Sequence, residues 1–269
     1  MKKIHIIAAA ITVLVIIAGL FIYFKRQPAQ AQGSPAVVSV DIAEAENAVI
    51  AGDLVKAKQL YQQARESADD PEKGEALRVK VEDLNTKILF SPAITGECAV
   101  DYQVQAGDAL AKIARKFNTT VGLIKRINSL SSDNIKLNQK LKVNTCKFSV
   151  VVDKSQNLLF LKSGDEVVKT YLVSTGANNS TPVGKFTIVN KLENPTWYKS
   201  GAVIPANSAD NILGSRWMGF DLKGYGIHGT TIPQDLGKQV TAGCVRMRNE
   251  EVDELYDIIP AGAEVVIVD

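Results

Sequence analysis

The sequence predicts a multidomain α+β protein made of an N-terminal membrane anchor, a helical hairpin segment, a β-α-α-β module and a mostly-β C-terminal domain. Three observations predict it: a long apolar run near the start, helical spacing of apolar residues up to residue 89, and recurring β-branched runs after residue 148. Charge supports the same divisions, because residues 98–146 are basic whereas the segments before and after them are acidic. With 46% hydrophobic residues and a net charge of +2, the chain as a whole is neither disordered nor collagen-like.

Residues 4–24 are apolar with few interruptions, and basic residues flank them on both sides. At ~1.5 Å per residue, such a helix measures about 30 Å, the thickness of the hydrocarbon core of a bilayer. We therefore expect residues 1–26 to form a transmembrane anchor. A cleavable signal peptide has a shorter apolar region, although residues 29–31 (AQA) would serve as a cleavage site, so that alternative stays open. The flanking charges are nearly balanced and do not decide the orientation.

Residues 27–38 are small, polar and proline-containing, which predicts a short extended linker. Residues 39–92 have the spacing of helices, with Asp53 as an expected N-cap and a further helix starting at Asp70-Pro71. The stretch AGDLVKAKQLYQQA resembles one tetratricopeptide-type hairpin. A single unit of that kind buries little core, so a helical spacer packed on its neighbours is favoured over a peptide-binding groove.

Residues 98–146 are predicted to fold as β-α-α-β, with strands near residues 102–104 and 140–143 and helices after Gly107-Asp108 and Thr119-Thr120. From residue 102 to 143 the segment resembles a LysM module, through V-x-x-G-D-x-L-x-x-I-A and a later I-x-x-x-N. Ala109 departs from the usual Ser or Thr and removes a capping hydroxyl. The resemblance implies binding of N-acetylglucosamine-containing glycans. A small basic linker domain is the alternative, and nucleic acid is disfavoured because no aromatic residues interleave the basic ones.

Residues 148–269 are predicted to form a mostly-β domain, a sandwich or barrel with its own core. Short β-branched runs recur and are separated by turn clusters. Only residues 249–258 are expected to be helical, opening with acidic residues that complement the helix dipole.

Nucleophilic chemistry in this chain depends on very few residues. There are two histidines and three cysteines, too few for a zinc site of the Cys/His type, and we expect neither a metal nor a cofactor. His5 lies in the apolar run, which leaves His228, sixteen residues before Cys244. An imidazole near a thiol lowers the pKa of the thiol and then protonates a leaving amine. Gly243 would let a substrate approach the backbone, whose N–H groups here are expected oxyanion donors.

The segments STGANNSTPVGKFTIVNKLENPTWY, LGSRWMGF, YGIHGT and TAGCVRM resemble the catalytic domain of the L,D-transpeptidases (YkuD family). The resemblance implies that Cys244 is the nucleophile, that His228 is the general base and acid, and that the Gly229 carbonyl orients the imidazole. It also implies that Arg246 shapes the pocket or meets a substrate carboxylate. Trp217 and Gly243 are expected to belong to the substrate site.

The implied reaction acts on peptidoglycan stem peptides. Cys244 would attack the carbonyl between the diamino acid at position three and D-Ala at position four, release D-Ala and form a thioester. An amine of a neighbouring stem would then take the acyl group from this thioester, which forms a 3→3 cross-link. A glycan-binding module beside such an enzyme raises the effective substrate concentration. Both substrates lie outside the cytoplasmic membrane, so we expect a single-pass protein with everything after Arg26 on the extracytoplasmic side. Transfer to a protein lysine, an L,D-carboxypeptidase, and a non-catalytic wall-binding anchor are the alternatives.

Cys98 and Cys146 bracket the LysM-like segment. Pairing of the two strands of a β-α-α-β module would bring both ends of the segment together, and an extracytoplasmic location permits oxidation. We therefore expect a Cys98–Cys146 disulfide, with Cys244 left free. Two separate buried thiols are the alternative.

Overall fold

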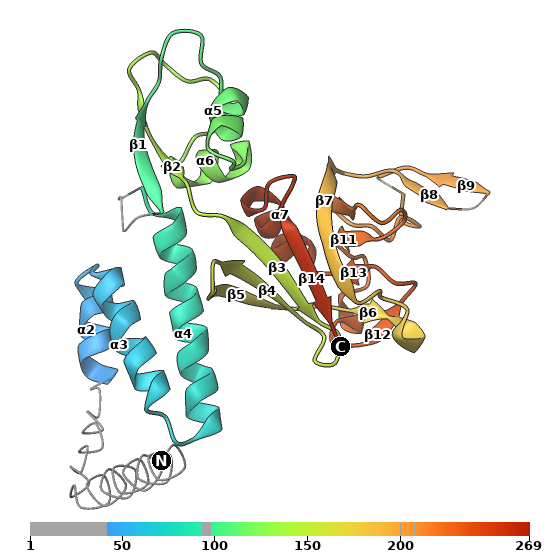
Figure 1. Cartoon of the computed structure of the whole chain (residues 1–269), viewed down its shortest axis with the longest axis horizontal. Coiled ribbons are helices and arrows are strands. Elements are labelled where there is room, and N and C mark those ends of the chain that lie inside the picture. The colour runs from blue at the N-terminus through green and yellow to red at the C-terminus, as the bar shows by residue number, and fades with distance from the viewer. Residues whose placement is uncertain (1–41, 93–97, 200, 207) are drawn as a thin grey trace, which may run out of the picture. The chain divides into compact units, whose positions relative to one another are not determined.

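A computed structural model describes residues 42–92, 98–199, 201–206 and 208–269 (Figure 1). The expected anchor, residues 1–26, and the linker, residues 27–38, lie outside this part of the chain. Within the described residues, no helix has the combination of length and apolar character needed to cross a bilayer. The described residues belong to one compact unit.

The helical segment consists of α2 (Ile42–Ile50), α3 (Leu54–Glu66) and α4 (Pro71–Phe90). Asp53 caps α3 by accepting a hydrogen bond from the Lys56 N–H at 3.1 Å, and Asp70 caps α4 directly before the proline. Both helix starts were predicted from these residues, because an aspartate oxygen satisfies an N–H group that has no partner in the first turn.

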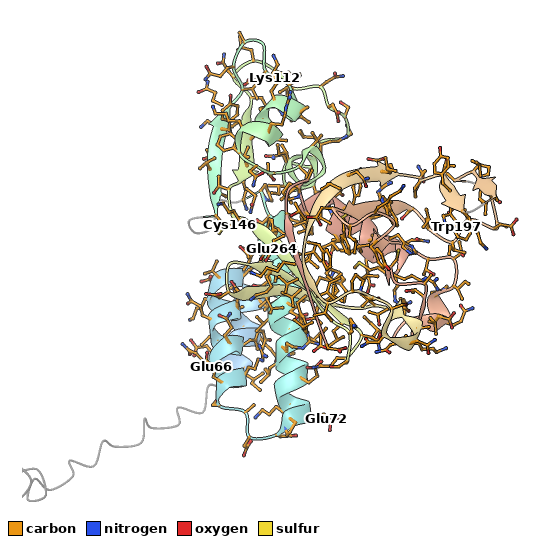
Figure 2. The ribbon with its side chains drawn as sticks, turned by 45° about the vertical axis from the view of Figure 1, so that its right-hand side comes forward. Glu66, Glu72, Lys112, Cys146, Trp197 and Glu264 are labelled. Carbon is orange, nitrogen blue, oxygen red and sulfur yellow. A yellow bond between two sulfur atoms is a disulfide. The ribbon has the colours of Figure 1, made fainter. Side chains whose placement is uncertain are left out.

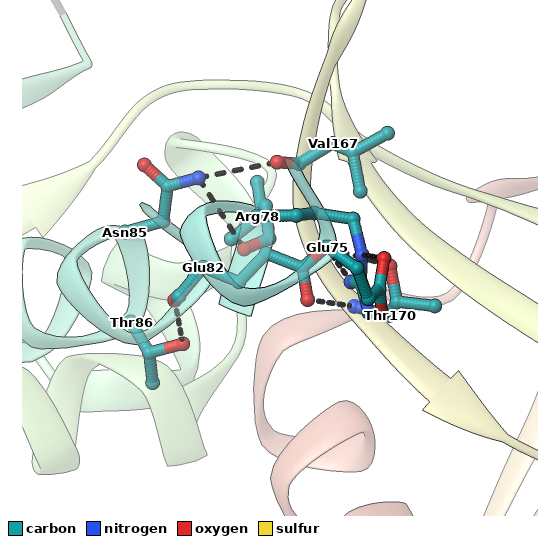
Figure 3. Close-up of polar contacts among 8 residues, drawn as sticks. Glu75, Arg78, Glu82, Asn85, Thr86, Val167 and Thr170 are labelled. Carbon is teal, nitrogen blue, oxygen red and sulfur yellow. Dashed lines mark hydrogen bonds and ion pairs between the residues drawn. The ribbon is translucent and has the colours of Figure 1, made fainter. Parts of the chain in front are cut away.

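Helix α4 packs against β5 (Glu166–Leu172), which is an edge strand of the large sheet (Figure 3). Glu82, only 8% exposed, accepts hydrogen bonds from the Thr170 N–H at 3.0 Å and from its hydroxyl at 2.7 Å. Asn85 donates to the Val167 carbonyl at 3.1 Å. An uncovered edge strand presents free backbone groups that invite pairing with other chains, and α4 satisfies several of them here. This contact supports the spacer interpretation of the helical segment.

Removing the Glu82 carboxylate should destabilise the protein by about 2 kcal/mol, because the Thr170 N–H loses its side-chain partner and the partly buried Arg78 guanidinium loses one of its two carboxylates. Urea unfolding of Glu82→Ala measures the loss. Glu75→Ala is the matched control, since Glu75 also pairs with Arg78 but its side chain is 61% exposed. We expect less than about 0.5 kcal/mol there. Equal losses in the two variants would contradict the role of Glu82.

The LysM segment contains β1 (Ala99–Gln103), α5 (Leu110–Lys116), α6 (Val121–Ile127) and β2 (Lys140–Asn144), with β1 and β2 antiparallel. Thr120 caps α6, and Ala109 gives α5 no side-chain cap. Cys98 and Cys146 are joined by a disulfide, with their Cα atoms 4.9 Å apart (Cys146 is labelled in Figure 2). The predicted β-α-α-β order is confirmed.

Helix α6 is buried on two faces. Ile124 lies in the small LysM core, whereas Leu123 and Ile127 belong to the core of the C-terminal domain, and all three are fully buried. The Thr120 hydroxyl also donates to the Asp257 carbonyl, and a side chain at Gly122 would collide with the Asp257 carboxylate. The LysM segment is therefore packed directly onto the C-terminal domain.

The C-terminal domain is built on one mixed sheet of eight strands in the order β13-β11-β10-β7-β14-β3-β4-β5. Besides β5, the sheet contains β3 (Phe148–Asp153), β4 (Leu158–Ser163), β7 (Gly184–Glu193), β10 (Arg216–Phe220), β11 (Gly226–His228), β13 (Val245–Arg246) and β14 (Glu264–Val268). Two further ladders pair β6 (Thr175–Gly176) with β12 (Gln239–Thr241) and β8 (Trp197–Lys199) with β9 (Ala202–Ile204).

The mostly-β character of this domain is confirmed, and its sheet is open at β13 and β5, as a half-barrel is, where we had expected a sandwich or barrel. Helix α7 (Asn249–Ile258) has the predicted bounds and buries Val252, Leu255 and Ile258 in the core. Its acidic first turn and apolar spacing of three explain why the sequence predicted it correctly.

Candidate active site

Three of the expected site residues are neighbours across three adjacent strands. Trp217 on β10 is paired with His228 on β11, and His228 is paired with Arg246 on β13. Residues directly opposite each other on paired strands lie on the same face of a sheet. Successive residues alternate between faces, so Ile227 and Val245 point the other way and are fully buried in the core. The strand pairing therefore places a tryptophan, an imidazole and a guanidinium in one row.

The His228 ring is held from two sides. Its Nδ1 lies 2.7 Å from the Gly229 carbonyl oxygen, and the Trp217 ring stacks on it with centroids 5.9 Å apart. His228 is 2% exposed, and this burial lowers its pKa to about 4, opposed by the carbonyls of Gly229 and Leu213. The imidazole is thus neutral at pH 7, and a neutral ring that donates from Nδ1 has its Nε2 free to accept a proton.

Cys244 immediately precedes β13 and is partly exposed. Its thiol donates to the Gly224 carbonyl at 3.5 Å, rather than to His228. Burial raises the pKa of the thiol, while the Gly226 N–H and the positive charge of Arg246 lower it. At neutral pH the free protein therefore holds a neutral thiol and a neutral imidazole, and the thiol must lose its proton as it attacks. Hydrogen bonds of catalytic groups are often long without substrate and tighten when it binds.

Gly243 has a φ of +125°, and a Cβ there would lie 2.6 Å from a ring carbon of Tyr225. The backbone at this position therefore requires glycine. The Gly243 N–H, one of the backbone N–H groups near Cys244, donates to the Thr241 hydroxyl at 3.1 Å. The same hydroxyl donates to the Cys244 carbonyl at 2.7 Å, so Thr241 fixes the turn that presents the thiol.

Arg246 is 7% exposed, and its Nε has no hydrogen-bond partner among the described residues. Burial lowers the pKa of its guanidinium, opposed by Asp235 and by the Cys244 thiol. A buried guanidinium without a full set of partners favours binding of an anion.

These residues border one cavity of about 390 Å³ that Cys244, His228, Arg246 and Trp217 line together. Strand β8 and the loop before it also line this cavity, through residues that include Trp197, which is labelled in Figure 2. A larger cleft of about 640 Å³ borders α6 and α7 and contains neither Cys244 nor His228.

The comparisons with known proteins place both segments. Residues 147–267 match the model of the L,D-transpeptidase catalytic domain, and residues 102–144 match the LysM domain. The protein named "Putative L,D-transpeptidase YqjB" of Bacillus subtilis is 44% identical over 126 residues, which is 45% of this chain and 70% of that protein. "Putative L,D-transpeptidase YkuD" of Bacillus licheniformis is 33% identical, over 62% of this chain and 97% of that protein. The chain belongs to the L,D-transpeptidase family.

Among solved structures, the catalytic domain of an Enterococcus faecium L,D-transpeptidase aligns with a TM-score of 0.39 and 21% identity, over 45% of this chain and 97% of that one. In this L,D-transpeptidase family member, several cavity-lining residues were not predicted from the sequence: Leu192 on β7, Pro195 in the loop that follows, and Tyr198 on β8. The segment NPTWY was part of the resemblance, but no pattern in it indicated that it would face the thiol. The sequence also gave no signal for Asn249, whose contacts are described below.

Proposed function

We propose that this chain is a peptidoglycan L,D-transpeptidase that forms 3→3 cross-links through a thioester on Cys244. The observation that carries the proposal is that Cys244, His228 and Arg246 line one cavity, with His228 Nδ1 held by the Gly229 carbonyl. A nucleophile, a base and a group that orients the base are the parts required for acyl transfer by a thiol.

The reaction has two halves. His228 takes the proton of Cys244 as the sulfur attacks the carbonyl carbon between residues three and four of the stem, and the C–N bond breaks. His228 then gives that proton to the amine of the departing D-Ala, leaving a thioester. An amine of a second stem attacks the thioester, its proton passes to His228, and the thiol is restored as the new amide forms. Atoms and charge balance with no cofactor.

Arg246 supplies recognition in this proposal. The leaving D-Ala carries a free carboxylate, and the guanidinium that borders the cavity offers the matching charge and an Nε that no described residue hydrogen-bonds. The aromatic rings of Trp197 and Trp217 give the rest of the peptide an apolar surface to lie against.

The LysM segment and the N-terminus complete the proposal. The LysM module would bind N-acetylglucosamine-containing glycan, and residues 4–24 would anchor the protein in the cytoplasmic membrane with its domains on the extracytoplasmic side. Support for this location comes from the length of the apolar run and from the substrate of the family, which lies outside that membrane.

Muropeptide mass spectrometry tests the reaction directly. Incubation with a disaccharide tetrapeptide should give free D-Ala and a 3→3 linked dimer. A substrate whose side-chain amine is acetylated serves as the control, because it can act as donor but not as acceptor, and it should yield no dimer. Tripeptide monomer alone from the free-amine substrate would indicate a carboxypeptidase, and a substrate left intact would indicate a non-catalytic wall-binding protein. Either result would overturn the proposal.

A further inference from the structure

Asn249, the first residue of α7, makes an unusual set of contacts beside the candidate active site. Its Oδ1 accepts hydrogen bonds from the Thr230 N–H at 3.1 Å and from the Ser215 N–H at 3.2 Å. Its Nδ2 donates to the Thr230 carbonyl at 2.9 Å. The two donors on one side and the acceptor on the other fix which end of the amide is oxygen.

The contact with Thr230 is linked to His228 through one peptide unit. The Thr230 N–H and the Gly229 carbonyl belong to the same trans peptide, so they point in opposite directions. Asn249 holds the N–H end of this peptide, and the carbonyl end meets His228 Nδ1 at 2.7 Å. Whatever fixes the plane of this peptide therefore fixes the direction from which the carbonyl meets the imidazole.

The Asn249 amide lies close to the backbone of two glycines. A Cβ built on Gly229 or on Gly214 would collide with Asn249 Oδ1, and Gly214 has a φ of +67°. The amide thus lies between two glycines whose missing side chains allow it to reach the backbone. Hydrogen bonds arranged in series also polarise one another, so the bond from Thr230 to Asn249 strengthens the Gly229 carbonyl as an acceptor.

We propose that Asn249 is a positioning residue that sets the tautomer and direction of His228 through the Gly229–Thr230 peptide. With this peptide fixed, the neutral imidazole carries its proton on Nδ1 and keeps Nε2 free to accept the thiol proton. The consequence for turnover rests on the proposed function, whereas the effect on the tautomer does not depend on it.

The LysM segment contains a matched control. Asn128 accepts from the Lys142 N–H at 2.8 Å and donates to the Lys142 carbonyl at 2.8 Å, the same two-bond clamp on one residue's backbone. Asn128→Ala therefore removes similar hydrogen bonds at a place that has no contact with the Gly229–Thr230 peptide.

The experiment compares Asn249→Ala, Asn249→Asp and Asn128→Ala in the full chain, kept in detergent micelles, with a stem tetrapeptide that lacks glycan. Asn249→Ala should lower kcat at least about 10-fold, while KM changes less than about threefold. The loss should not exceed the ~10²–10⁴-fold that general acid–base catalysis contributes in total. Asn128→Ala should keep kcat within about twofold. Asn249→Asp retains the acceptor for the Thr230 N–H and should recover part of the loss.

Nitrogen-15 NMR of the histidines gives a second measurement that needs no turnover, since the chain has only two of them. At pH 7, wild type and Asn249→Asp should show His228 protonated on Nδ1, and Asn249→Ala should show a mixture of both tautomers. An unchanged tautomer in Asn249→Ala would overturn the proposal. So would a loss of kcat no greater than in Asn128→Ala. If Asn249→Ala does not fold, the test rests on Asn249→Asp, in which the Nδ1–H tautomer of His228 must still dominate. Absence of that tautomer in Asn249→Asp would equally overturn the proposal. A wild type that turns over no substrate but shows these tautomers would refute the proposed function alone.

Discussion

Cys244→Ala should lower D-Ala release by at least about 10³-fold while the protein stays folded, because loss of a catalytic nucleophile removes the covalent route altogether. No other cysteine replaces it, since Cys98 and Cys146 are bonded to each other. His228→Gln should cost about 10²–10⁴-fold, since glutamine has no basic nitrogen at neutral pH. Chromatography of free D-Ala measures both, and thermal unfolding establishes that each variant is folded.

The pH dependence of the wild type checks the same assignment. With the His228 pKa lowered to about 4, the imidazole is neutral and able to accept a proton above that pH. The acid limb of kcat/KM should therefore fall near pH 4 and not near 6.5, because protonation of His228 below its pKa removes the base.

More than a few per cent of wild-type activity in Cys244→Ala would refute the mechanism.

Removing the disulfide should cause the largest loss of stability. The bond closes a loop of sequence separation 48, which restricts the unfolded chain by about 4 kcal/mol in the entropy model. The Thr145 N–H also donates to the Cys98 carbonyl at 2.9 Å, so the bond staples the two strand ends that already pair. A LysM segment of this size has a small core, and a covalent link contributes a large share of its stability.

Urea unfolding of the Cys98→Ala/Cys146→Ala double variant measures that loss, with the reduced wild type as the control. The double variant avoids a new free thiol that would exchange with Cys244. Peptide mapping without reductant should recover a linked 98–146 peptide from the wild type. A bridge to Cys244 in that map would contradict both the disulfide and the assignment of the nucleophile. An unchanged urea midpoint in the double variant would contradict the stabilising role of the disulfide.

Local patterns predicted much of this structure because they have local causes. Helix caps at Asp53 and Asp70 and the whole of α7 follow from residues within one or two turns of each other. His228 and Cys244 line one cavity, in agreement with the family resemblance, whose two motifs place these residues sixteen positions apart. These parts of the fold and of the site needed no knowledge of distant contacts.

Long-range contacts were not predictable in the same way. Glu82 and Thr170 are 88 residues apart, and neither lies in a pattern that points to the other. The helix after Thr119-Thr120 was predicted, but its spacing did not indicate that Ile124 and Leu123 enter different cores. The partner of the Gly243 N–H could not be predicted for a similar reason, because the Thr241 side chain turns back to accept that hydrogen bond. The sequence gives the polarity of a residue and its local periodicity. Which distant residue it contacts depends on the tertiary fold.

The burial of Leu123 and Ile127 in the C-terminal core has a consequence for how such a protein is divided or recombined. The boundary at residue 147 separates two sequence families, but it cuts through a single hydrophobic core. A fragment that starts at residue 148 loses two fully buried side chains and exposes the surface that they cover. The LysM module of this chain therefore cannot be replaced by another LysM module without regard to how it packs on the catalytic domain. A donor module grafted in its place must carry apolar residues at both positions of α6, or the catalytic half loses part of its own interior.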